Sequence, residues 1–99
     1  MKKQDTPFDC HVFVCVKSRS SERKFCGDGD NPDLKLRLKN EIRSRGWKGA
    51  VRVSEASCLG QCDTGPNIML YPQGIWFSET TLEDLPEILQ TLEDLLAEA

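Results

Sequence analysis

Five cysteines in a chain of 99 residues constrain this sequence more than any other feature. An odd number of cysteines argues against a framework of disulfide bonds, and the polar, charged N-terminus shows no export signal. In a reducing compartment, cysteines in a small domain are more often metal ligands or reactive groups than disulfide partners. We therefore expect a cytoplasmic protein whose cysteines bind a metal centre. Four of them follow the spacing C-x10-C-x31-C-x3-C and are Cys15, Cys26, Cys58 and Cys62.

The composition predicts one small soluble domain over residues 1–99, with residues 1–9 as a loosely held N-terminal arm. Hydrophobic residues make up 38% of the chain, so the core should be thin, and a bound cofactor or a second subunit would help to stabilise it. The net charge is −3 with both signs well mixed, which argues against nucleic acid as a partner. No apolar run approaches the length of a membrane span.

The first half of the chain predicts a strand, a helix and a second strand. Residues 11–16 form a β-branched and aromatic run that is typical of a buried strand. The Asn-Pro pair at 31–32 suits a helix start, Gly46 suits a left-handed helix end, and residues 50–53 are expected to form a short strand. The apolar stripe of this helix repeats every four residues and consists of Leu34, Leu38 and Ile42.

The second half predicts a hairpin followed by a terminal helix. Residues 67–71 and 75–77 are short strands, and the Pro-Gln-Gly sequence at 72–74 forms the turn between them. Asp84 and Glu87 are expected to form a capping box at the start of the last helix. Its apolar stripe has a period of three to four residues and consists of Leu82, Leu85, Ile88, Leu89, Leu92, Leu95 and Leu96.

The element order is therefore β-α-β-β-β-α, an α/β fold with a mixed four-stranded sheet and two helices. The first two strands should be parallel with a right-handed crossover, and the last two should be antiparallel. Parallel strands end at the same edge of a sheet, so the loops after residues 16 and 53 should emerge together. Cys26, Cys58 and Cys62 lie in these loops and Cys15 lies near the end of the first strand, so the four sulfurs can converge.

Four thiolates are the ligands that a [2Fe–2S] cluster requires, two on each iron. Structural zinc is the first alternative, but zinc motifs bring their ligands in close pairs and only Cys58 and Cys62 qualify here. A dithiol reductase is the second alternative. It would require C-x-x-C after the first strand, whereas this chain has C-x3-C after the second.

Three other residues have a chemical interpretation beside a structural one. Cys10 is expected to be an unreactive thiol on the arm or at a strand edge, although it could in principle replace a ligand. His11 could replace a thiolate, as histidines do in Rieske centres, but a strand residue is the expected role. Trp76 is expected to shield the cluster or to form a dimer surface rather than simply to fill the core.

These motifs resemble the thioredoxin-like [2Fe–2S] ferredoxins, and the resemblance extends from His11 to about Leu96. It implies a thioredoxin-like fold, a homodimer, and Cys15, Cys26, Cys58 and Cys62 as the cluster ligands. The segments that carry the resemblance are HVFVC at 11–15, Arg19, Cys26, CLGQC at 58–62, Gly-Pro at 65–66 and YPQGIWF at 71–77.

The expected function is one-electron transfer between redox partner proteins, with no catalysis by the chain alone. No nucleotide-binding motif such as GxGxxG or a P-loop occurs in the sequence. Redox sensing and delivery of the cluster to another protein are alternatives of a second class, and a zinc-held interaction module is a third.

Overall fold

The fold is built from residues 1–15, 31–56 and 67–98, which are the parts of the chain that the computed structural model describes. Within them, the strands and helices follow one another in the predicted order β-α-β-β-β-α. One additional short 3-10 turn precedes the last helix. The elements are β1 (Cys10–Cys15), α1 (Asn31–Ser44), β2 (Val51–Ala56), β3 (Ile68–Tyr71), β4 (Ile75–Phe77), η3 (Leu82–Asp84) and α2 (Leu85–Glu98).

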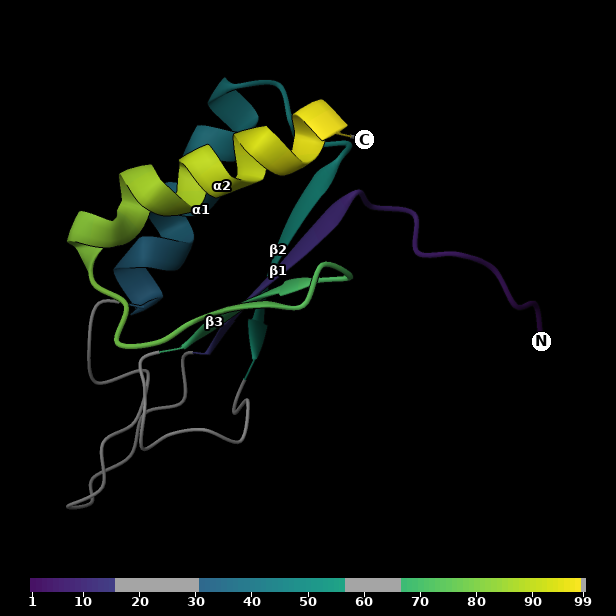
Figure 1. Cartoon of the computed structure of the whole chain (residues 1–99), viewed down its shortest axis with the longest axis horizontal. Coiled ribbons are helices and arrows are strands. Elements are labelled where there is room, and N and C mark those ends of the chain that lie inside the picture. The colour runs from purple at the N-terminus through teal and green to yellow at the C-terminus, as the bar shows by residue number, and fades with distance from the viewer. Residues whose placement is uncertain (16–30, 57–66, 99) are drawn as a thin grey trace, which may run out of the picture.

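The four strands form one mixed sheet in the order β2-β1-β3-β4. Strand β1 pairs in parallel with β2 and antiparallel with β3, which in turn pairs antiparallel with β4. The predicted mixed four-stranded sheet is thus confirmed. Because β1 and β2 are parallel, they end at the same edge of the sheet, where Cys15 lies opposite Ala56 (Figure 1).

Both α-helices lie on one face of this sheet and bury the hydrophobic core against it (Figure 1). Every second residue of a strand points to the same face, which is why the buried strand positions alternate along β1. From the strands, the core takes Cys10, Val12, Val14, Val51, Val53, Ile68 and Leu70. From the helices it takes the predicted stripe Leu34, Leu38 and Ile42, together with Ile88, Leu89 and Leu92.

Helix α1 ends as predicted, in a left-handed turn at Gly46. This glycine has φ of +76°, a conformation that a residue with a Cβ rarely adopts. The turn allows the Trp47 amide to donate a 2.9 Å hydrogen bond to the Ile42 carbonyl, which would otherwise have no helical partner. Trp47 then packs against the core, so the chain is directed back toward β2.

The start of α2 differs from the predicted capping box of Asp84 and Glu87. The capping pair is Thr81 and Asp84, since the Thr81 amide donates to Asp84 Oδ2 at 2.8 Å. The Asp84 amide in turn donates to the Thr81 carbonyl at 3.0 Å. The prediction was wrong because the helical path already begins in the 3-10 turn η3, three residues earlier than the cap that the leucine period suggested.

The strand boundaries also differ in part from those expected. Strand β1 begins one residue before the predicted 11–16 and ends at Cys15, and β2 extends to Ala56 instead of ending at residue 53. The added residues Ser54, Glu55 and Ala56 have weak strand preference, and they are held in strand geometry by pairing with β1.

The face of the sheet opposite the helices, here called the open face, has a partly apolar surface. Phe13, Met69 and Trp76 lie side by side across β1, β3 and β4 in the pairing register. Trp76 is 38% exposed, whereas Phe13 and Met69 are half-buried. The same face of the sheet also includes His11, Arg52, Ser54 and Tyr71.

The N-terminal residues 1–7 are exposed and extend away from the sheet (Figure 1). The chain first contacts the body at half-buried Phe8 and at Asp9, whose carbonyl accepts a 2.8 Å hydrogen bond from the Gln73 side chain. Within the described parts of the chain, neither helix is long and apolar enough to cross a membrane.

Two leucines of α1 provide a matched test of this packing. Leu38 is fully buried against the sheet, and Leu36 in the same helix is 57% exposed. We predict that Leu38→Ala lowers the free energy of unfolding by about 2–5 kcal/mol, because it leaves a cavity in a thin core. Leu36→Ala should change it by less than about 0.5 kcal/mol. Urea denaturation measures both, and equal losses would contradict the placement of the helix.

Candidate metal centre

Cys15 is the one predicted ligand that lies within the described residues. It is the last residue of β1 and is fully buried. The other three predicted ligands, Cys26, Cys58 and Cys62, lie outside the described residues. No group of three or more His, Cys, Asp or Glu side chains within residues 1–15, 31–56 and 67–98 could bind a metal. The described residues alone therefore do not complete a centre around Cys15, and the other three predicted ligands belong to the segments 16–30 and 57–66.

Both ends of the segment that carries Cys58 and Cys62 are fixed beside Cys15. At one end, Ala56 is the register partner of Cys15 on the parallel strand β2. At the other end, the Asn67 carbonyl accepts a 3.2 Å hydrogen bond from the Cys15 amide. The segment 57–66 thus leaves the sheet on one side of Cys15 and returns on the other.

The segment that carries Cys26 also begins at this edge, because it follows Cys15 directly in the chain. It ends at Asn31, the first residue of α1. The described framework therefore brings the starts of both cysteine-bearing segments to one edge of the sheet. Four thiols supplied from such an edge are a donor set that suits a [2Fe–2S] cluster.

Asn67 has a structural role that the sequence did not reveal. Its side chain is fully buried, and its Oδ1 accepts a 3.2 Å hydrogen bond from the Trp76 indole Nε1–H. One residue thus joins the backbone of Cys15 to the side chain of Trp76. An asparagine before a short strand gives no local signal of this role, because both contacts are made with residues of other strands.

Trp76 lies on the open face near this edge, with its indole nitrogen directed to Asn67. Its 38% exposure excludes the simple core-filling role. The ring therefore remains available for the two roles expected of it, shielding of a cluster or contact with a second subunit.

Cys10 differs from its predicted place on the arm or at a strand edge. It is the first residue of the central strand β1 and is fully buried in the core. At about 3.3 Å per residue, its Cα lies roughly 17 Å from that of Cys15, at the opposite end of the strand. This distance excludes a shared metal site for the two thiols.

His11 is a strand residue, as expected. A 2.7 Å hydrogen bond joins its Nε2 to Ser54 Oγ, and its ring stacks on Phe13 with centroids 4.1 Å apart. Burial and the nearby Arg52 cation both lower its pKa, so the imidazole is neutral at pH 7. His11 lies four residues before Cys15 along an extended strand, roughly 13 Å away at about 3.3 Å per residue, too far to ligate the same metal.

Burial of Cys10 gives a prediction about stability at high pH. Burial raises the pKa of this thiol from 9.0 to about 11, so the folded chain retains a proton that the unfolded chain loses. We therefore expect the free energy of unfolding to fall as the pH rises from 9 toward about 11.

The comparison variant is Cys10→Ala, because every other titrating group is then the same in both proteins. Chemical denaturation at a series of pH values should show a smaller decline for the variant. An identical decline in the two proteins would contradict the protonated, buried thiol.

Comparisons with known proteins extend this geometry. No protein-family model matches the chain. A protein of Clostridium pasteurianum named "Ferredoxin, 2Fe-2S" is 30% identical over 83 residues, which span 82% of this chain and 81% of that protein. A protein of the same name from Aquifex aeolicus is 26% identical over 83 residues, covering 81% of this chain and 75% of that protein.

The fold has solved counterparts as well. The crystal structure of the wild-type thioredoxin-like [2Fe-2S] ferredoxin from Aquifex aeolicus superposes with a TM-score of 0.77 at 25% identity. The superposition covers 86% of this chain and 84% of that one. A second structure of such a ferredoxin from the same organism gives a TM-score of 0.76 at 25% identity, covering 85% and 78%. The expected α/β thioredoxin-like fold is thereby confirmed. The chain belongs to the thioredoxin-like [2Fe–2S] ferredoxin family.

Proposed function

We propose that this ferredoxin carries one electron at a time on a single [2Fe–2S] cluster bound by the thiolates of Cys15, Cys26, Cys58 and Cys62. The observation that carries the proposal is the position of Cys15. It is buried between Ala56 and Asn67, the two residues that bound the segment holding Cys58 and Cys62. The segment holding Cys26 starts at the same place.

The bound cluster supplies reversible one-electron chemistry between its diferric and mixed-valence states. The chain itself contributes a rigid site for one ligand, because β1 is an inner strand of the sheet and Cys15 is held by Ala56 on one side and by Asn67 on the other. Burial of Cys15 keeps water away from that ligand. No enzymatic step is required of this arrangement, so the chain acts on other redox proteins only by giving and taking electrons.

The ligand set also determines the expected reduction potential. Four thiolates without an imidazole favour a low value, and plant-type clusters of this kind have potentials near about −400 mV. The one histidine of the chain supports this value, since His11 is held by Ser54 and Phe13 away from the ligand edge. A potential above zero would contradict the all-thiolate set.

Replacing single cysteines tests the ligand set. We predict that Cys58→Ser strongly shifts or bleaches the visible absorption of the anaerobically purified protein, because a thiolate ligand is lost. Cys10→Ser is the control and should leave the spectrum unchanged, because Cys10 lies at the other end of β1. Iron and zinc analysis of the same samples separates a [2Fe–2S] cluster from structural zinc. The reverse pattern of the two variants would overturn the assignment.

We also propose that the protein is a homodimer located in the cytoplasm. Retention of a thiolate-bound cluster suits a reducing compartment, which supports the location. The open face supports the dimer, because the row of Phe13, Met69 and Trp76 leaves apolar area uncovered by either α-helix. Self-complementary contact of such a face about a two-fold axis is the commonest way to bury it.

A charge placed in the middle of this row tests the dimer. We predict that Met69→Glu converts the protein from twice the chain mass to the 11.2 kDa of one chain, because a buried carboxylate at the interface would be unpaired. Leu36→Glu adds the same charge on exposed helix surface and should leave the dimer intact. Sedimentation equilibrium measures the masses. A monomeric wild type, or a dimeric Met69→Glu variant, would contradict the proposed interface.

A further inference from the structure

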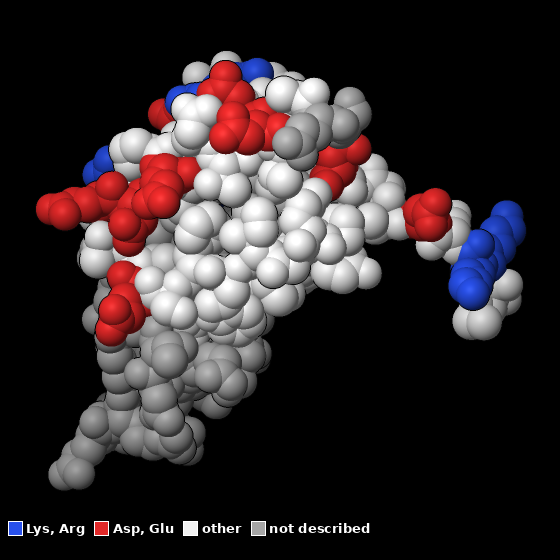
Figure 2. Space-filling model, viewed as in Figure 1, with Lys and Arg blue, Asp and Glu red and all other residues white. Residues whose placement is uncertain are grey.

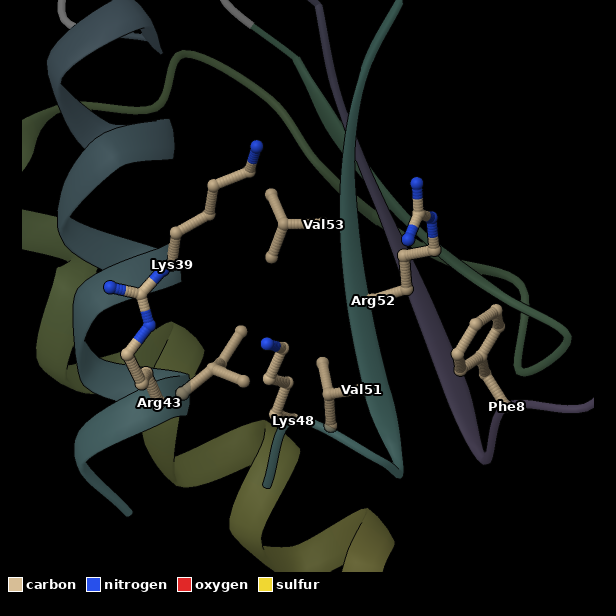
Figure 3. Close-up of a pocket in the computed structure, with 8 residues that line it drawn as sticks. Phe8, Lys39, Arg43, Lys48, Val51, Arg52 and Val53 are labelled. Atoms are coloured by element: carbon tan, nitrogen blue, oxygen red, sulfur yellow. The ribbon is translucent and has the colours of Figure 1, made fainter. Parts of the chain in front are cut away.

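A groove runs along the outer edge of β2, apart from the row of Phe13, Met69 and Trp76 proposed for the dimer. Figure 2 shows acidic side chains gathered over α2, whereas the groove is lined by basic ones. The groove has a volume of about 240 Å³ and an apolar floor formed by Ile42, Val51 and Val53. Four basic residues surround this floor and are here called the rim: Lys39, Arg43, Lys48 and Arg52. Arg52 and Phe8 lie on the side of β2 away from α1, and the other three rim residues lie on the α1 side (Figure 3).

None of the four rim cations is in an ion pair within the described part of the chain, although Lys39 lies close enough to Glu55 to interact with its charge. The described ion pairs join Lys35 to Glu55 and Arg45 to Glu41, and none includes a rim cation. Arg52 instead lies over the Phe8 ring, with its guanidinium carbon 5.9 Å from the ring centroid. The rim therefore presents a positive field to an incoming ligand, on a chain whose net charge is −3.

The floor of the groove offers backbone hydrogen bonds as well as apolar surface. Strand β2 is at the edge of the sheet. The Cys10 amide donates to the Ala50 carbonyl at 3.1 Å, so Ala50 and Arg52 direct their backbone groups toward β1. In a parallel pair the backbone groups of the intervening residues point away from the partner strand. The backbone N–H and C=O groups of Val53 and Glu55 therefore point outward from the sheet. Among the described residues no strand pairs with this edge.

We propose that this groove binds an extended acidic segment of a partner protein, which adds as a fifth strand to the edge of β2. Its backbone pairs with the outward groups of Val53 and Glu55, and the side chains on the face toward α1, apolar and acidic in turn, lie over the valine floor. Its carboxylates lie against the basic rim. The segment would run along β2 toward Ala56, and so toward the edge where Cys15 lies. The proposal rests on the groove alone and is independent of the cysteine ligand set.

Basic side chains on an edge strand also serve to prevent pairing between copies, and a test must separate that role from binding. The probe is a fluorescent peptide of about ten residues that repeats valine-serine-glutamate-serine, so that one face of the strand carries valine and glutamate in turn; this length suits one strand. We expect fluorescence anisotropy to show saturable binding to the intact protein that weakens with added salt. The same peptide with lysine in place of glutamate should not bind.

Charge reversal on the rim is the matched test. Arg43→Glu with Lys48→Glu should weaken peptide binding by about tenfold or more, because both rim attractions become repulsions. Lys3→Glu with Arg37→Glu makes the same change in net charge on exposed surface outside the groove and should leave the affinity unchanged. If the reversed variant fails to fold by circular dichroism, Arg43→Gln with Lys48→Gln replaces it, with a smaller loss expected.

Hydrogen–deuterium exchange then locates the bound peptide. Slower exchange at the Val53 and Glu55 amides is the expected result. The proposal is overturned by absent binding, by equal affinity of the rim and control variants, or by protection confined to α1 or the open face. Protection of these amides without peptide would indicate that two copies pair through β2, and it would also overturn the proposal. Tighter binding of single-stranded oligothymidylate than of the acidic peptide would overturn it as well.

Discussion

The parallel pairing of β1 with β2 is the constraint on which the rest of this structure depends. It sets Cys15 opposite Ala56, so that two segments far apart in sequence leave the sheet at one edge. Antiparallel pairing would send them to opposite edges and separate the cysteines. Parallel strands require a crossover element between them, and α1 with its stripe Leu34, Leu38 and Ile42 supplies it. Helix α1 therefore both packs on the core and, as the crossover, allows β1 and β2 to end side by side where the cysteine-bearing segments begin.

The two faces and the outer edge of the sheet have separate roles in this account. The helical face holds the core, including the neutral thiol of Cys10. The open face has a row of apolar rings and methionine that suits a second subunit, and the edge of β2 has a basic groove that suits an acidic strand. Because the groove does not include Phe13, Met69 or Trp76, a dimer formed through that row could bind partner proteins at both outer edges. The helical face, the open face and the outer edge of β2 all meet the end of the sheet where Cys15 lies.

The features that could be predicted from the sequence are those determined by local pattern. The stripe of α1, its end at Gly46, the hairpin of β3 and β4 and the parallel pairing all follow from residue periodicity and turn chemistry. Cys15 could be placed at a strand end for the same reason. The spacing of the cysteines indicates a common site only in combination with this topology, because parallel strands bring their following loops to the same end of the sheet.

The features that sequence reasoning missed depend on contacts between distant elements. Strand β2 continues through Ser54 and Glu55 because β1 pairs with them, although their own preference for strand is weak. Cys10 is core because it lies on the same face of β1 as Val12 and Val14, which the helices cover, and no local pattern reveals this. Asn67 is the clearest case, since its contacts with Cys15 and Trp76 join three strands. The capping pair of Thr81 and Asp84 was missed because a 3-10 turn precedes the leucine period.

The most direct test of the central claim is the EPR spectrum of anaerobically purified protein before and after reduction with dithionite, recorded beside its visible absorption. The account predicts a coloured protein that is EPR-silent as isolated, because the two ferric spins cancel. Reduction should bleach the colour and yield one unpaired spin per chain. A colourless protein that contains zinc and gives no signal after reduction would contradict the electron-transfer function.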